Sequence, residues 1–136
     1  MKGFEPVTLS WDGTDYTVPP NEQLMLIAEL EYIISGADTH QTIPTLLKPT
    51  GPPTPILSKA YAHALRAAGA DVTGDEIYLS IQEDLAAGGS ELVYEKVQGA
   101  VMDLIMIISP PLGREIAGQT IKKPDPAEKA QPAEKD

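Results

Sequence analysis

Two histidines, His40 and His63, are the first side chains to consider for chemistry, because imidazole serves both as a metal ligand and as a general base. Neither histidine belongs to an H-x-x-x-H or H-E-x-x-H pattern, the spacings that place ligating groups on one face of a helix. The sequence therefore predicts no metal site built on a pair of histidines.

A group of carboxylates in the middle of the chain could instead suggest a site for a divalent cation, which prefers oxygen ligands. These residues are Asp71, Asp75, Glu76, Glu83 and Asp84. They lack the D-x-[DN]-x-[DN]-G spacing that directs several oxygens at one ion. We interpret them as an acidic face in contact with solvent and expect no metal.

The residues that nucleophilic catalysis requires do not occur in a recognisable arrangement. The chain contains no cysteine, no G-x-S-x-G elbow and no glycine-rich loop that could hold a phosphate. The paired carboxylates of Glu29 and Glu31 fall on the surface of a predicted helix, in contact with water. We therefore expect a protein that is not an enzyme and that needs no cofactor.

The charge of the chain is strongly negative, with 20 acidic against 10 basic side chains and a net charge of -10. Residues 121–136 contain four lysines and four acidic residues, so the whole excess lies in residues 1–120. An acidic surface repels phosphate backbones and anionic lipids, so nucleic acid and membranes are not expected partners. A basic protein partner is expected, although the same charge would also serve solubility alone.

No segment predicts secretion or membrane insertion. The chain begins with M-K-G-F-E-P, without the apolar run of a signal peptide. The apolar run over residues 100–108 is much shorter than the roughly 20 residues that span a bilayer. With no cysteine available for a disulfide, we expect a soluble protein of a reducing, intracellular compartment.

The longest apolar periodic segment, residues 90–109, predicts an amphipathic helix of about 30 Å that begins at a Ser90 N-cap and ends before Pro110. Its main stripe contains Val93, Val97, Ala100, Val101, Leu104 and Ile108. Met102 and Met106 add apolar groups to the opposite side, so the helix needs two partners. One is the core of the chain itself; the other is a second subunit, a client protein, or further helices of the same chain.

Residues 7–18 predict a β-hairpin, because Asp12-Gly13 lies between two β-rich runs and both residues accept positive φ angles. One face of this hairpin is expected to pack on helices, since a lone two-stranded hairpin is marginally stable. That face contains Val7, Leu9, Trp11, Tyr16 and Val18.

Three more helices are predicted. The first, residues 21–34, has a core stripe and also carries Leu24, Met25 and Tyr32 on its other side, so it too offers two sides for packing. A loop over residues 37–53, with one helical turn near 45–48, leads to a second helix that Thr54 caps. The third follows a capping box at Thr73, with Ile77, Tyr78, Ile81 and Leu85 on one face.

These elements predict a mainly helical α+β fold, in which an N-terminal β-hairpin packs on a bundle of four to five helices. Residues 1–120 form one interaction domain. Residues 121–136 contain PAEK twice and no large apolar side chain beyond Ile121, so they predict a low-complexity, disordered tail.

The segment VTLSWDGTDYTV, followed by the helix NEQLMLIAELEYII, resembles the start of tail assembly chaperones from phages with long, non-contractile tails and from gene-transfer-agent-like particles. The resemblance implies a chaperone in the host cytoplasm that binds the tape measure protein, helps the tail tube protein to polymerise and does not stay in the particle. A homo-oligomer is also expected, because the second apolar side of the helix over residues 90–109 can pack against another subunit. Because many members gain a second domain by ribosomal frameshifting, Lys122-Lys123 marks a possible frameshift position.

Combined with the apolar surplus, the resemblance leads us to expect a client groove surrounded by acidic residues. The residues expected to line it are Met25, Leu26, Leu30, Met102, Met106 and Ile107. Two other functions remain open: a structural head–tail or tail component that is retained in the virion, and an acidic inhibitor that mimics DNA.

Overall fold

A computed structural model describes residues 3–49 and 51–122 of the chain. Its N-terminal hairpin consists of β1 (Val7–Trp11) and β2 (Thr14–Val18), which pair antiparallel with Val7 opposite Val18 and Leu9 opposite Tyr16. Asp12 and Gly13 have φ angles of 52° and 80°, as a two-residue turn with positive φ at both positions requires. The predicted hairpin and its inward face are confirmed, since Val7, Leu9 and Val18 are buried.

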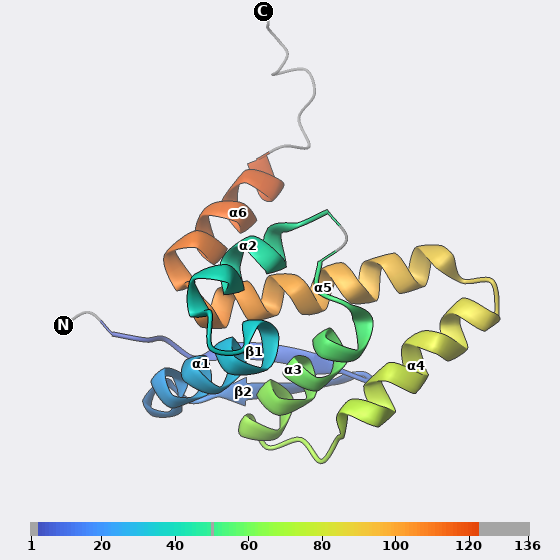
Figure 1. The fold of residues 1–136 in the computed structure, drawn as a ribbon, viewed down its shortest axis with the longest axis horizontal. Helices are drawn as coiled ribbons and strands as arrows, with labels where there is room; N and C mark the ends of the chain where they lie inside the picture. Colours follow the sequence, from blue (N-terminus) through green and yellow to red (C-terminus); the bar gives the residue numbers. More distant parts are fainter. Residues whose placement is uncertain (1–2, 50, 123–136) are drawn as a thin grey trace, which may run out of the picture.

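Helices and the loops between them make up the rest of the described chain (Figure 1). They are α1 (Pro20–Ser35), the 3₁₀ turn η1 (Thr39–Gln41), α2 (Thr42–Leu47), α3 (Thr54–Ala67), α4 (Gly74–Ala86), α5 (Ser90–Ile108) and α6 (Pro110–Lys122). The predicted fold class is confirmed. The described residues form six α-helices, one more than the largest number predicted. The sixth, α6, can begin directly after α5, because Pro110 and Pro111 stand in its first turn, where a helix tolerates proline.

The ends of the helices follow local sequence signals closely. The Thr73 capping box forms as predicted: Glu76 N donates to Thr73 Oγ1 at 3.2 Å, and Thr73 N donates to Glu76 Oε1 at 2.8 Å. Two predicted caps are wrong by one residue. Thr54 and Ser90 are the first residues of their helices, and Pro53 and Gly89 occupy the cap positions without a side-chain hydrogen bond.

Helix α3 lies at the centre of the core. It packs against α1, α4, α5 and β2, and Ala60, Ala62 and Ala64 are fully buried along it. Small side chains allow the neighbouring helices to approach closely, and larger aliphatic residues fill the space around them. Among the largest fully buried side chains are Leu9, Leu26, Leu30, Leu46, Leu57, Leu65, Leu104 and Ile107.

Helix α6 folds back on the end of α5 and rises from it in Figure 1. The approach is close, because a Cβ atom added at Gly113 would lie 2.8 Å from the Cα atom of Met106. The helix continues to Lys122 and so includes the first two residues of the predicted tail. The predicted disorder of residues 123–136, and Lys123, lie outside the described residues.

Candidate functional site

The residues predicted to line a client groove do not form one surface. Leu26, Leu30 and Ile107 have exposed fractions of 2%, 0% and 0%, so no partner of the folded chain can contact them. This part of the prediction is corrected. The reason is that Leu26 and Leu30 lie on the side of α1 that faces the core, and Ile107 lies on the side of α5 that does the same.

Met102 and Met106 lie elsewhere, half-buried in a hollow of about 440 Å³ between β1, α5 and α6. Both pack against the hydrophobic core, and α6 contacts α5 beside Met106. The second partner that α5 needed is therefore, at least in part, a further helix of the same chain. A groove shared by these methionines and α1 is not formed.

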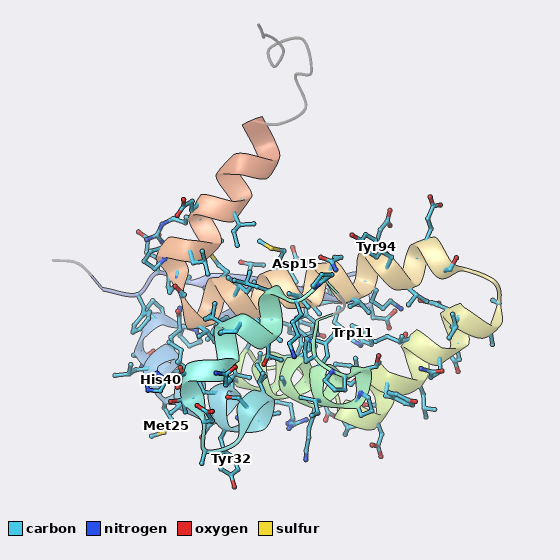
Figure 2. The ribbon with its side chains drawn as sticks, turned by 45° about the horizontal axis from the view of Figure 1, so that its top comes forward. Trp11, Asp15, Met25, Tyr32, His40 and Tyr94 are labelled. Atoms are coloured by element: carbon cyan, nitrogen blue, oxygen red, sulfur yellow. The ribbon has the colours of Figure 1, made fainter. Side chains whose placement is uncertain are left out.

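Met25, in contrast, projects into solvent from α1. With about 100° of rotation per residue, Leu24, Met25, Ala28 and Tyr32 fall within about 100° of the helix circumference, opposite the core residues Gln23, Leu26, Leu30 and Ile34. Leu24, Met25 and Tyr32 are 70%, 68% and 69% exposed. Figure 2 shows Met25 and Tyr32 projecting from the same edge of the molecule. We call these four residues the α1 stripe.

Carboxylates border the α1 stripe on both sides. By the same helical rotation, Glu22 and Glu29 follow its Met25 edge and Glu31 follows its Leu24 edge. Glu29 Oε1 lies 2.7 Å from His63 Nε2 of α3. Beside this contact, a mainly apolar hollow of about 430 Å³ opens between α1 and α3, lined by Ala28, Glu29, Tyr32, Ile33 and His63. The arrangement suits an apolar helix that carries basic residues at its borders.

A buried polar pair elsewhere could suggest chemistry. Tyr61 Oη of α3 donates a hydrogen bond to Asp103 Oδ2 of α5 at 2.7 Å and lies 3.1 Å from the carbonyl oxygen of Ser10 in β1. Burial raises the pKa of Asp103, while the hydrogen bond from Tyr61 lowers it. Burial and the nearby Asp103 carboxylate raise the pKa of Tyr61. Because the pair joins three elements of the core, we assign it a structural role.

A second polar cluster fixes α4 and α5 to the hairpin. Lys96 Nζ of α5 lies 2.6 Å from Asp84 Oδ2 and 3.0 Å from Ser80 Oγ, both of α4. The same ammonium group lies 5.6 Å from the centroid of the Trp11 ring. A polar cavity of about 530 Å³, lined in part by Trp11, Ser80 and Lys96, opens beside it. This cluster was not predicted, since it joins segments far apart in the sequence.

Within residues 3–49 and 51–122, no group of three or more histidine, cysteine, aspartate or glutamate side chains could hold a metal ion. Over the same residues, no helix has both the length and the apolarity that crossing a membrane demands.

Sequence reasoning named Met25 but left Leu24 and Tyr32 out of the predicted site. The signal for them was present, because their spacing places all three on the side of α1 opposite its core stripe.

Comparisons with protein families, with curated proteins and with solved structures found no match to the chain.

Proposed function

We propose that the chain is a tail assembly chaperone of a phage with a long, non-contractile tail, and that it binds the tape measure protein through the α1 stripe. The observation that carries the proposal is this exposed apolar stripe with carboxylates along both edges. The resemblance to tail assembly chaperones covers the hairpin and α1, which is the part of the chain that holds the stripe.

The proposed mechanism is reversible binding without catalysis. Helices α2, α3 and α5 pack against α1, so its outer side is presented on a packed element. Burying a Leu, Met or Tyr side chain contributes about 1.5–3 kcal/mol, and part of this gain is lost to the entropy of association. Such moderate binding suits a chaperone that keeps an apolar client soluble in the host cytoplasm and then leaves it.

Charge adds specificity to this contact. Glu22, Glu29 and Glu31 border the stripe, and the whole chain has a net charge of -10. Complementary charge mainly speeds association and selects the partner. The proposed client segments are therefore amphipathic helices with lysine or arginine next to their apolar stripe. Self-association and contact with the tail tube protein stay predictions.

Co-expression with the tape measure protein tests the proposal. We expect the wild-type chain to keep the client soluble and to co-elute with it, and the double variant M25S/Y32S to lose both effects. L79S is the matched control, because Leu79 of α4 is 58% exposed but lies outside the stripe. Thermal unfolding should show all three proteins folded. Co-elution that survives M25S/Y32S, or an insoluble client beside the wild-type chain, would contradict the proposal.

Mass spectrometry of purified particles separates the proposal from the alternative of a retained head–tail or tail component. A chaperone that leaves before the tail is complete should be missing from the particles. Its presence in a fixed ratio to the tail tube protein would favour the retained component.

A further inference from the structure

The hollow between α1 and α3 is continuous with the α1 stripe. Ala28 and Tyr32 belong to both, and Glu29, Ile33 and His63 complete the lining of the hollow. The side chains of Glu29 and His63 are 48% and 30% exposed, so solvent and a partner can both reach them. A client helix that covers the stripe therefore lies beside this pair.

Glu29 and His63 form a pair whose net charge depends on one proton. His63 Nε2 lies 2.7 Å from Glu29 Oε1. Because an ionised carboxylate only accepts hydrogen bonds, Nε2 carries the hydrogen and donates it. Nδ1 of the neutral ring is then an acceptor, and no group within residues 3–49 and 51–122 is bonded to it. Uptake of a proton at Nδ1 retains the hydrogen bond and cancels the negative charge of the pair.

The carboxylate of Glu29 has a second oxygen available to a partner. Only Oε1 is hydrogen-bonded to another residue of the described chain, and Oε2 is not. A lysine or arginine at the border of a client helix can donate to Oε2. When His63 is neutral, this cation meets a full negative charge, whereas a protonated His63 opposes it. The same contact is therefore weaker in acid.

The charged groups on α3 and α4 near His63 are of types that ordinarily keep their charge in mild acid. Lys59 and Arg66 lie one helical turn before and one helical turn after His63. They line a separate hollow with Asp75 and Tyr78 of α4. Carboxylate, ammonium, guanidinium and phenol groups ordinarily titrate below about pH 5 or above about pH 9. We expect these neighbours to contribute a constant background.

The charged groups that the other elements bring to α3 have partners of their own. Asp103 of α5 bonds to Tyr61, which precedes His63 by two residues and so lies on the opposite side of α3. Asp15 of β2 accepts a hydrogen bond from Ser10 Oγ of β1. Histidine is the side-chain type that ordinarily changes its charge between about pH 5 and pH 8. We therefore expect His63 to respond to mild acid at the edge of the stripe.

We infer that Glu29 receives a lysine or arginine of the client helix at the edge of the α1 stripe, and that protonation of His63 weakens this contact. Client binding then weakens as the pH falls from about 8 to about 5.5. This inference rests on the proposed function, because it concerns the same stripe and the same basic client helix.

Titration calorimetry with a synthetic helical peptide tests the inference. The peptide carries leucine at positions i, i+3, i+4 and i+7 with lysine beside them, and it is titrated into the full chain at both pH values. We expect the wild-type chain to bind it about two- to fivefold more weakly at the lower pH, the effect of one partly exposed charge. Lysine and glutamate ordinarily stay ionised at both values, so the difference reports on histidine.

H63Q and H40Q are the matched pair of variants. Glutamine at position 63 can still donate to Glu29 but does not titrate, so the ratio of the two affinities should fall to about one. H40Q removes the other histidine of the chain, which is exposed in η1, and should keep the wild-type ratio. A ratio that H63Q leaves at the wild-type value, or one that H40Q abolishes, would overturn the inference.

E29Q tests the acceptor itself. It removes the same unit of negative charge that protonation of His63 cancels, so it should weaken binding at the higher pH by a similar factor. An unchanged affinity of E29Q at that pH would overturn the assignment of Glu29.

M25S/Y32S separates a failure of the inference from a failure of the proposed function. This variant should abolish peptide binding at both pH values. A peptide that does not bind, or that binds M25S/Y32S as tightly as the wild-type chain, would contradict the proposed function and with it the inference. Binding that requires the stripe but is equally tight at both pH values would overturn the inference alone. Thermal unfolding at both pH values confirms that each variant is folded.

Discussion

Asp103 of α5 is a carboxyl group whose pKa its surroundings raise. Its carboxylate accepts a hydrogen bond from Tyr61 at 2.7 Å, yet burial dominates and raises its pKa above the ordinary 3.8. As the pH rises from that ordinary value to the native pKa, the unfolded chain releases the proton while the folded chain retains it. The contribution of Asp103 to the free energy of unfolding therefore falls with rising pH in this interval.

The variant D103N tests whether the contribution of Asp103 to the free energy of unfolding falls as the pH rises. Asparagine can still accept the hydrogen bond from Tyr61, but it has no charge to bury and does not titrate. Relative to D103N, we expect the wild-type chain to be less stable at about pH 7 than at about pH 3, measured by urea unfolding. D71N, at an exposed loop position, controls for the loss of one charge. A difference in stability that stays constant with pH would contradict the assignment.

A second residue-scale feature is the side chain of Ser58. It is 1% exposed in the middle of α3, and its Oγ has no hydrogen-bond partner. A buried polar group without a partner costs about 1–3 kcal/mol, and alanine is the better helix former.

We therefore expect S58A to raise the free energy of unfolding by about 1 kcal/mol. Urea unfolding measures the change. S80A provides the contrast, because Ser80 Oγ accepts a hydrogen bond from Lys96 Nζ at 3.0 Å and its removal should not stabilise the chain. A less stable S58A would show that the hydroxyl has a favourable role.

At the scale of elements, the contact between α5 and α6 decides how much of the methionine side of α5 reaches solvent. Gly113 makes the contact possible, since an added Cβ atom would lie 2.8 Å from Met106 Cα, a backbone atom that cannot rotate away. The position thus requires glycine for lack of space, although a helix interior ordinarily disfavours it.

The variant G113A should separate the two helices slightly and lower the free energy of unfolding by about 1–3 kcal/mol. G99A is the matched control in α5, where nothing lies within 4 Å of an added Cβ atom. That variant should instead be more stable by about 0.5–1 kcal/mol, because alanine is the better helix former. Equal stability of the two variants in chemical unfolding would show that α6 does not pack as described.

At the scale of the whole molecule, the described chain ends with a helix that reaches Lys122. The resemblance to tail assembly chaperones implies that ribosomal frameshifting at Lys122-Lys123 adds a second domain, and Lys122 is the last residue of α6. The frameshift remains a prediction.

The nucleotide sequence tests the frameshift. We expect a slippery heptamer at the codons of Lys122 and Lys123 and an overlapping reading frame downstream. Expression from the native gene should then yield a second, longer product that contains the same N-terminal peptides by mass spectrometry. A gene with no such heptamer and no overlapping frame would contradict the frameshift prediction.

Local features of the fold could be predicted from the sequence, because a few neighbouring residues determine them. The Asp12-Gly13 turn requires only two positive φ angles, and the Thr73 capping box requires only hydrogen bonds between residues three apart. The helices follow from the period of their apolar residues. The fold class was predictable for the same reason.

Which apolar stripe is covered was decided only in the tertiary structure. Met25 and Met106 both lie on the second apolar side of a helix, yet Met106 packs beneath α6 whereas Met25 is 68% exposed. Likewise Ile81 is buried and Leu85, one turn later, is not. Periodicity places a side chain on a face of its helix, but burial requires that another segment, often distant in the sequence, lies against that face.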